Sequence, residues 1–326
     1  MKSMIKRIVF FGECMVEHNA DGVTAFGGDT FNTAWYLAQL LRQVKHDEIT
    51  VSYATALGTD SASADLTAML SAAHINQDYI IITPESRLGE YWISLDDNGE
   101  RRFTFARDKS PVKAYFNRQQ RLIQALQDKQ VDAIYLSGVS LAILCDSQRR
   151  CLFQALAMFK EAGGMIFFDN NYRQALWSSP EAKQSYLALM PLVDIAFLTD
   201  EDEYAVYGTQ GVDDIISLHQ QRSMQPQILV IRQGAKPCLL VSSNDTPVIY
   251  IAAQHIKPTL ILDTCGAGDA FAGGFMAQWL LGTELRSATR FAHRVAAKVI
   301  QHHGALIPEH LLPSLETQEC HYENTL

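Results

Sequence analysis

Short apolar segments alternate with longer helical stretches along most of the chain, and this alternation constrains the fold more than any other feature. The segments are rich in Val, Ile, Phe and Tyr, which is typical of buried strands. They lie at residues 8–11, 51–54, 133–136, 165–168, 195–198, 228–231 and 239–241. Strands separated by helices form parallel βαβ units. The sequence therefore predicts an α/β fold with a central, mostly parallel sheet flanked by helices.

Two segments interrupt this alternation and carry no helix of their own. Residues 20–28 form the first. The second, residues 87–107, has two alternating stretches around an Asp-Asn-Gly turn, a pattern typical of a β-hairpin. Because no repeat or linker divides the chain, we expect one domain over residues 1–326. We also expect a small β lid, formed from segments near 14–27 and 84–110, that closes over a cleft.

Composition excludes several functional classes. The 326 residues include 27 Lys and Arg against 36 Asp and Glu, a formal net charge of −9, and they contain no basic run. Proteins that bind nucleic acid or anionic lipid usually carry a basic excess, so we expect neither partner. No apolar stretch approaches the roughly 18 residues of a membrane span. The six cysteines form no CxxC pair, and free thiols are typical of a reducing cytoplasm.

The most informative segment is TLILDTCGAGDAFAGGFMAQWLLG. It predicts a strand over 259–262, a turn of small residues and a helix over 269–281. The turn contains Gly266, Ala267 and Gly268, whose backbone N–H groups can face a ligand at the positive end of the helix dipole. An oxyanion or a transferring phosphoryl group would be stabilised there.

Asp269 follows in the first turn of the predicted helix and has two interpretations. It is either a base that accepts the proton of an attacking hydroxyl or a residue that caps the helix. Cys265 precedes the small residues, near a helix N-terminus that would lower the pKa of its thiol. It is either a reactive thiol or a buried, inert one.

Polar side chains also stand at two other ends of predicted elements. A glycine pair precedes a predicted helix, and Asn32 lies one turn in, where it suits a sugar hydroxyl or local capping. Asp169, Asn171 and Arg173 follow a strand, where ligands gather in open α/β sheets. Arg173 can pair bidentately with phosphate or carboxylate. The GxGxxG motif of nicotinamide oxidoreductases and the Gly-Lys of a Walker loop are both missing.

These motifs occur in the order found in the ribokinase-like, or PfkB-type, carbohydrate kinases, which the chain resembles from about residue 8 to residue 310. The shared positions are Gly27-Gly28 with Asn32, Leu57-Gly58-Thr59-Asp60, Asp169-x-Asn171-x-Arg173, Arg232-x-Gly234-Ala235 and Asp263-Thr264-x-Gly266-Ala267-Gly268-Asp269. The resemblance implies a three-layer ribokinase-like fold with a β lid, and ATP-dependent phosphoryl transfer to a sugar hydroxyl. GECMVEH, FGGDTFNTA and FDNNYRQALW are most similar to family members that phosphorylate the sugar acid 2-keto-3-deoxygluconate.

The resemblance assigns roles to individual residues. Asp269 would be the catalytic base, and the amides of residues 266–268 the anion hole. Sugar contacts would come from Gly28, Asn32, Tyr91, Arg107, Arg173 and Asp269. Nucleotide contacts would come from residues 266–268 and from Asn171, Arg173, Arg232, Gly234, Ala235 and Lys236. A hydrated Mg²⁺ would lie near Asp202, and K⁺ near Asp263. Lid edges in this family pair between subunits, so a homodimer through the lid is expected.

Two arginines favour a sugar acid over a neutral sugar. Arg107 from the lid and Arg173 from the sheet are both offered to the substrate, and a guanidinium grips a carboxylate bidentately. Phe105 and Ala106 stand where the resembled enzymes carry aromatic hydroxyl or indole groups. Fructose or a related ketose or deoxy sugar is therefore an alternative substrate. A non-catalytic sugar sensor on the same fold is a further alternative, against which Asp269 argues.

Overall fold

Nine strands form the central sheet of the protein. The computed structural model describes residues 5–18, 24–44, 48–95, 101–118, 120–220, 226–242 and 247–315. The strands are β1 (Arg7–Phe11), β4 (Thr50–Leu57), β5 (Ile80–Ile82), β8 (Ala133–Ser137), β9 (Met165–Asp169), β10 (Ile195–Thr199), β11 (Ile228–Arg232), β12 (Cys238–Ser242) and β13 (Ile249–Ile251). The seven strands predicted from the alternating apolar segments are all present. The two that were missed, β5 and β13, have only three residues each.

The strand order is β13-β12-β11-β10-β9-β8-β1-β4-β5. From β11 to β5 every neighbouring pair is parallel. At the other edge, β12 and β13 run antiparallel to their neighbours. The prediction of a mostly parallel sheet is confirmed.

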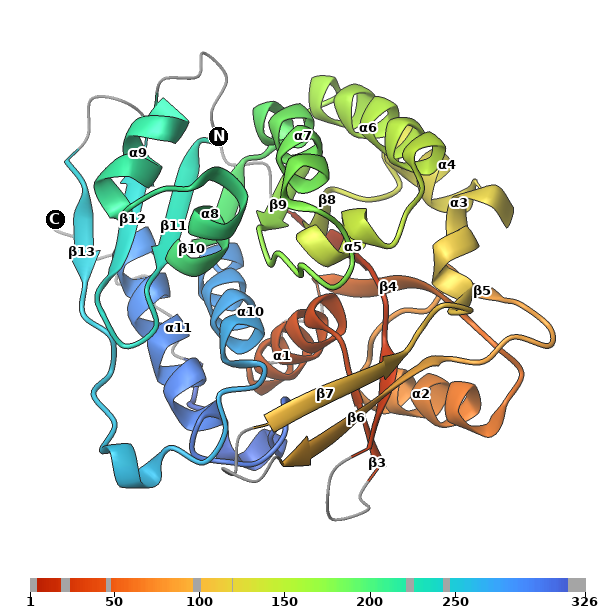
Figure 1. Ribbon diagram of the computed structural model, residues 1–326, viewed down its shortest axis with the longest axis horizontal. Coiled ribbons are helices and arrows are strands. Elements are labelled where there is room, and N and C mark those ends of the chain that lie inside the picture. Colours follow the sequence, from red (N-terminus) through yellow and green to blue (C-terminus); the bar gives the residue numbers. More distant parts are fainter. Residues whose placement is uncertain are drawn as a thin grey trace, which may run out of the picture.

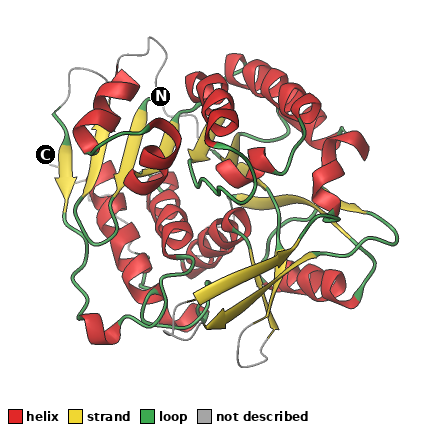
Figure 2. Cartoon of the chain, in the orientation of Figure 1, coloured by secondary structure: helices red, strands yellow, loops and turns green. Residues whose placement is uncertain are grey.

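Helices cover both faces of this sheet, giving three layers (Figures 1 and 2). One face packs against α1 (Asp29–Gln43), α2 (Ser61–Ala72), α10 (Ala267–Leu280) and α11 (Leu285–Val299). The other packs against α3 (Tyr115–Arg118), α4 (Arg121–Gln127), α5 (Gly138–Ala142), α6 (Asp146–Glu161), α7 (Ser179–Leu189), α8 (Asp200–Tyr207) and α9 (Val212–Gln220). Alternate strand residues bury themselves in opposite layers, Ile8 and Phe10 in the first and Val9 and Phe11 in the second. Burial on both faces explains why the strands are apolar throughout.

A second sheet forms the predicted lid. It consists of β2 (Met15–His18), β3 (Thr24–Gly27), β6 (Gly89–Leu95) and β7 (Arg101–Ala106), in the order β3-β2-β6-β7. β6 and β7 are antiparallel, as the hairpin pattern predicts, and β2 joins them by parallel pairing with β6. The Asp-Asn-Gly turn lies outside the described residues. Closure of this sheet over a cleft remains a prediction.

The predicted strand over 259–262 is wrong. The chain forms a short 3-10 helix, η3 (Pro258–Leu260), followed by a loop. The backbone N–H groups of Leu262 and Asp263 both donate to the carbonyl of Ile300 at the end of α11, at 2.8 and 3.3 Å. Without a neighbouring strand, Leu260 and Leu262 are about half exposed. The apolar pattern is that of a strand, but the backbone donors bond within the 3-10 turn, from Leu260 and Ile261, and to the end of α11, from Leu262.

Within the described residues, no disulfide joins Cys14, Cys145, Cys151, Cys238 or Cys265. Burial raises the pKa of the Cys14 thiol, and raises that of Cys238 to about 12. Cys320 lies outside the described residues. Within those residues, no helix is both long and apolar enough to cross a membrane.

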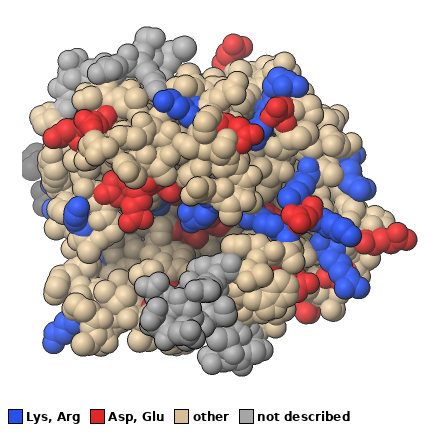
Figure 3. Space-filling view, in the orientation of Figure 1, with Lys and Arg blue, Asp and Glu red and all other residues tan. Residues whose placement is uncertain are grey.

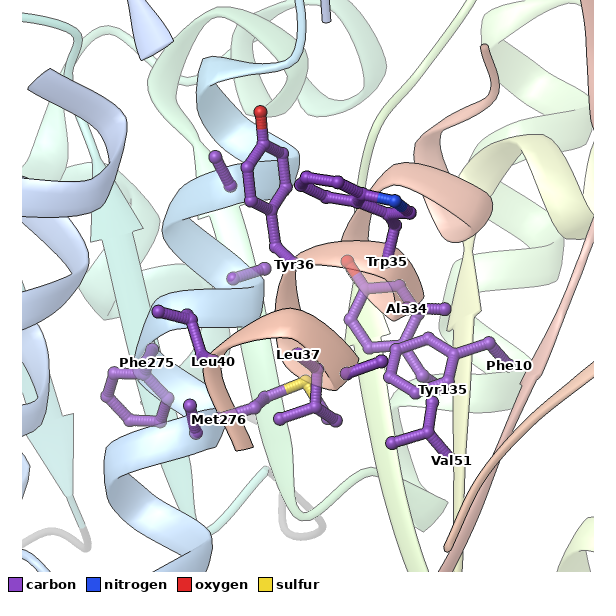
Figure 4. Close-up of a cluster of buried hydrophobic side chains, with 14 of the residues drawn as sticks. Phe10, Ala34, Trp35, Tyr36, Leu37, Leu40, Val51, Tyr135, Phe275 and Met276 are labelled. Carbon is purple, nitrogen blue, oxygen red and sulfur yellow. The ribbon is translucent and has the colours of Figure 1, made fainter. Parts of the chain in front are cut away.

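The helices α1 and α10 lie unusually close together. Figure 4 shows Tyr36, Leu37 and Leu40 of α1 beside Phe275 and Met276 of α10. A Cβ atom at Gly273 would lie 2.7 Å from the Cβ of Tyr36 and 3.0 Å from the carbonyl oxygen of Thr33. Glycine at this position therefore sets the separation between the two helices, and with it the separation between their N-termini.

Replacing Gly273 by Ala should destabilise the fold, because the added methyl group would push α1 and α10 apart. We expect the free energy of unfolding to fall by about 1–3 kcal/mol, the usual range for an overpacked core. Arg290→Ala, on the exposed face of α11, is the control and should change the free energy of unfolding by no more than about 0.5 kcal/mol. Denaturant unfolding followed by circular dichroism measures both. Equal stabilities for Gly273→Ala and the wild-type chain would contradict the close contact.

Candidate active site

The N-termini of α1 and α10 meet beside the carboxyl ends of the parallel strands. Gly28 is the N-cap of α1, and Gly266 is the N-cap of α10. Asn32, one turn into α1, donates from Nδ2 to Oδ2 of Asp269, in the first turn of α10, at 2.8 Å. The structure thus brings together the two motifs that the sequence singled out. In Figure 3 the surface is hollowed near the middle of the face shown, with acidic and basic side chains around the hollow.

The turn before α10 is fixed by its backbone. Gly266 has φ 70°, and a Cβ atom there would lie 2.7 Å from the carbonyl oxygen of Ala305, so only glycine fits. Because of this turn, α10 begins at residue 267, two residues earlier than predicted. Asp263 supports the turn through two hydrogen bonds. Its Oδ1 accepts from the backbone amide of Cys265 at 2.9 Å, and its Oδ2 accepts from the backbone amide of Gly304 at 2.8 Å. These two hydrogen bonds hold the turn in its shape.

Asp269 is a carboxylate whose ionisation is made difficult. Its pKa is raised to about 7, chiefly by burial and then by the negative charge of Asp29, while the hydrogen bond from Asn32 opposes the increase. A carboxylate that titrates near neutral pH is a stronger base than an ordinary aspartate, and base catalysis is most effective when the pKa lies near the working pH. The placement favours the base over the simple helix cap.

Asp29 is a site residue that the sequence analysis missed. It is the first residue of α1, where its Oδ2 accepts from Nδ2 of Asn171 at 2.6 Å and its Oδ1 from the amide of Thr30 at 2.8 Å. Burial raises the pKa of its carboxyl group. The signal was present in FGGDTFN, since an acidic residue directly after a glycine pair stands in the first turn of the predicted helix.

Arg232 lies beneath the turn and links three elements. From the end of β11, its Nη2 donates to Oδ1 of Asp169 at the end of β9 (2.7 Å), and its Nη1 donates to the carbonyl oxygen of Gly268 in α10 (3.1 Å). Its Nε is buried without a partner among the described residues. The sequence analysis expected a nucleotide contact from Arg232. The structure commits two of its donors to the protein itself, and a nucleotide contact from Arg232 stays a prediction.

Arg173 and Asp202 lie at the exposed side of the same region. Arg173 is exposed, and its positive charge opposes the raised pKa of Asp29, Asp202 and Asp269, so it stands near all three. Asp202 accepts from the hydroxyl of Thr199 at 2.7 Å, and burial raises its pKa.

The side chains around Asp202 fit a magnesium ion only if the ion keeps most of its water ligands. The described residues contain no group of three or more His, Cys, Asp or Glu side chains that could hold a metal ion. Mg²⁺ that keeps most of its waters and binds to substrate phosphates needs only one or two carboxylates. Asp202 can supply one of these through a water molecule.

The other predicted nucleotide residues stand apart from this cluster in a tight turn. Gly234, Ala235 and Lys236 connect β11 to β12 and are exposed. Gly234 has φ 59°, the left-handed conformation that glycine adopts most readily. Their side chains make no anion pocket by themselves, and their predicted role depends on the backbone of the turn.

On the lid side, two predicted sugar contacts are already held by carboxylates. The hydroxyl of Tyr91 in β6 donates to Oε2 of Glu17, and Nη2 of Arg107, just after β7, donates to Oε2 of Glu13. Both glutamates are 2% exposed. The sequence analysis missed them, although GECMVEH places two acidic residues in an otherwise apolar segment directly after the first strand.

The chain is similar over nearly its whole length to known carbohydrate kinases. Residues 5–311 match the pfkB family carbohydrate kinases. The chain is 38% identical over 318 residues to 2-dehydro-3-deoxygluconokinase of Escherichia coli (strain K12), covering 95% of this chain and 100% of that protein. Fructokinase from Vibrio cholerae O395, in its fructose-, ADP- and calcium-bound form, has a similar structure, with a TM-score of 0.77 and 24% identity over 93% of this chain and 95% of that one. A putative ribokinase II from E. coli, in complex with ATP and Mg²⁺, gives a TM-score of 0.75 at 18% identity over 92% and 94%.

The chain therefore belongs to the pfkB family of carbohydrate kinases. It has the ribokinase-like fold that the sequence predicts, and it is a phosphotransferase with an alcohol group as acceptor.

Turnover should increase as pH rises through about 7, because Asp269 must lose its proton before it can act as a base. Asp29→Asn removes the neighbouring negative charge, which lowers the pKa of Asp269. The acid limb of kcat/KM should therefore move to lower pH. Asp65→Asn, on the exposed side of α2, is the control and should leave the profile unchanged. An acid limb of Asp29→Asn that stays in place or moves to higher pH would contradict the account.

Proposed function

We propose that the protein phosphorylates 2-keto-3-deoxygluconate (2-dehydro-3-deoxygluconate) with ATP, giving 2-keto-3-deoxy-6-phosphogluconate. The observation that carries this proposal is Asp269, held by Asn32 in the first turn of α10, directly after the small-residue turn. The name of the 38% identical E. coli relative supports the choice of sugar. Two arginines near the site, Arg107 and Arg173, supply the charge that a sugar acid needs.

Phosphoryl transfer would follow from these positions. Asp269 accepts the proton of the primary hydroxyl, whose oxygen then attacks the γ-phosphorus of ATP as the bond to the ADP oxygen breaks. The amides of residues 266–268, at the positive end of α10, hold the charge that develops on the phosphoryl oxygens. Asn32 fixes the orientation of Asp269 throughout. Catalysis is thus mainly positioning and charge stabilisation.

The substrates would occupy two sides of this turn. The sugar acid lies toward Gly28, Asn32, Tyr91, Arg107 and Arg173, with the lid closed over it to exclude water. The nucleotide lies along Asn171, Arg173, Arg232, Gly234, Ala235 and Lys236. Mg²⁺ bound to the ATP phosphates would screen their charge, with Asp202 as a ligand through water. K⁺ near Asp263 completes the proposed set of ions.

Two other functions are alternatives to this one. Fructose, or a related ketose or deoxy sugar, is the alternative substrate. Phe105 favours it, because this ring is 46% exposed and has no hydroxyl group that could bind a sugar acid at that position. A non-catalytic sugar sensor is the alternative of another class. It is disfavoured because a sensor has no use for a carboxylate whose pKa is raised to about 7 beside an anion-binding turn.

Kinase activity on a panel of sugars, followed by coupled ADP release, tests the proposal. 2-Keto-3-deoxygluconate should give the highest kcat/KM, and fructose turned over equally well would refute the preference for a sugar acid. Asp269→Ala should lower kcat by about 10²–10⁴-fold, the usual contribution of a general base, while ATP still binds. A folded Asp269→Ala variant with wild-type turnover would refute the assignment of the base.

We also propose a cytoplasmic homodimer that pairs through the lid. Its outer face carries Trp92, which is 40% exposed and stacks on His18 at 5.0 Å between ring centroids. β3 and β7 are the edges of the lid sheet and have unpaired backbone groups to offer a second copy. Sedimentation equilibrium should give twice the chain mass of 36.4 kDa, and Trp92→Glu should shift it toward the monomer. A wild-type mass of one chain at all concentrations would refute the dimer.

A further inference from the structure

A buried ion pair joins the lid to the main sheet. Arg107 comes directly after β7 of the lid, and Glu13 lies shortly after β1 of the central sheet. Nη2 of Arg107 donates to Oε2 of Glu13, and the two side chains are 10% and 1% exposed. Arg107 is the lid residue proposed to grip the carboxylate of the sugar acid. Its guanidinium therefore already has a carboxylate partner in the chain without substrate.

This pair is incompletely satisfied. Within the described part of the chain, Nε of Arg107 and Oε1 of Glu13 are buried and have no hydrogen-bond partner. Most buried polar side-chain atoms are paired, so an unpaired donor on a buried guanidinium indicates a missing acceptor. A guanidinium has five N–H donors and Glu13 accepts from Nη2, so Nε is among the donors that remain for a second carboxylate.

The surrounding backbone keeps Glu13 in place. A Cβ atom at Gly28 would lie 2.2 Å from the carbonyl oxygen of Glu13. A Cβ atom at Gly89 would lie 3.1 Å from Oε1 of Glu13 and 3.2 Å from the Cβ of Arg107. Glycine at these two positions therefore lets the neighbouring backbone approach Glu13 closely.

We propose that Glu13 is a specificity-determining residue, which competes with the carboxylate of the sugar acid for Arg107 and so sets the affinity for that substrate. When a sugar acid reaches Arg107, the positive charge of Arg107 is already balanced by Glu13, and the negative charge of Glu13 repels the carboxylate of the sugar acid. A neutral sugar experiences neither effect. The competition requires an anionic substrate, so it rests on the proposed function.

The neighbouring pair of Glu17 and Tyr91 shows the contrast. It has the same burial and a similar position, but its donor is a neutral hydroxyl. Glu17 therefore has no positive charge to compete for. If Glu13 only tied the lid to the sheet through Arg107, its replacement would change acidic and neutral substrates alike.

Glu13→Gln tests the competition, since the Gln amide oxygen still accepts from Nη2 of Arg107 but the negative charge is gone. KM for 2-keto-3-deoxygluconate should fall by at least about threefold, because a charge within a few ångströms is removed, with kcat little changed. In an Arg107→Met background, Glu13→Gln should have no effect on KM. Glu90→Gln is the matched control, since this lid carboxylate pairs with His18 at 2.7 Å and is 37% exposed.

The outcomes separate the two proposals. A wild-type chain that turns over 2-keto-3-deoxygluconate, with a Glu13→Gln KM that is unchanged or higher, overturns the competition alone. An equal change in the Arg107→Met background also overturns it. A wild-type chain without turnover of this sugar acid overturns both. If thermal unfolding shows that Glu13→Gln is not folded, Glu13→Asp takes its place. Its carboxylate is one methylene further from Arg107, so KM should fall by a smaller factor, and a KM that does not fall overturns the proposal.

Discussion

The contact between α1 and α10 is the constraint on which the active site depends. Gly273 lets the two helices approach closely, and their N-termini consequently meet at one point beside the sheet. Each N-terminus offers unsatisfied N–H groups and a partial positive charge. Each also carries a carboxylate in its first turn, Asp29 on α1 and Asp269 on α10. The hydrogen bond from Asn32 to Asp269 fixes the register between them.

Charge balance within the chain explains how an acidic protein can bind anions. The formal net charge is −9, yet both proposed substrates are negative. Two of the arginines that the sequence singles out are partly neutralised by the chain itself, Arg107 by Glu13 and Arg232 by Asp169. Arg173 is exposed. Binding of anions therefore depends on helix N-termini, unused donors such as Nε of Arg107 and Nε of Arg232, and an ion carried by the nucleotide.

Much of the fold can be predicted from the sequence, because strands of the central sheet that are buried on both faces are apolar throughout. Strands such as β8 and β10 are almost wholly apolar, and each is followed by a helical stretch. The residues at 259–262 show where this reasoning fails. They have the apolar pattern of a strand, but Leu260 and Ile261 donate to Lys257 and Pro258 in a short 3-10 turn, and Leu262 donates to Ile300, 38 residues further along. Composition in a window of four residues cannot indicate such a partner.

The site was predictable to the extent that it is built from backbone turns. Gly266 is required by a positive φ, and Asp269 by its place in the next helical turn, so both leave local signals. Glu13 and Asp29 act through partners more than 90 residues away, Arg107 and Asn171. A single acidic residue after a strand or a glycine pair does not reveal its partner. Charge pairs of this kind appear only once the chain is folded.

The position of the new phosphate tests the central claim most directly. If Asp269 deprotonates a primary hydroxyl while Arg107 holds the carboxylate at the other end of the sugar acid, the phosphate must be attached at carbon 6. The phosphorus–proton coupling in the NMR spectrum of the product from 2-keto-3-deoxygluconate and ATP reports this position. The account predicts coupling to the two hydrogens of carbon 6. Phosphate on carbon 4 or 5, or phosphorylation of fructose in preference, would contradict it.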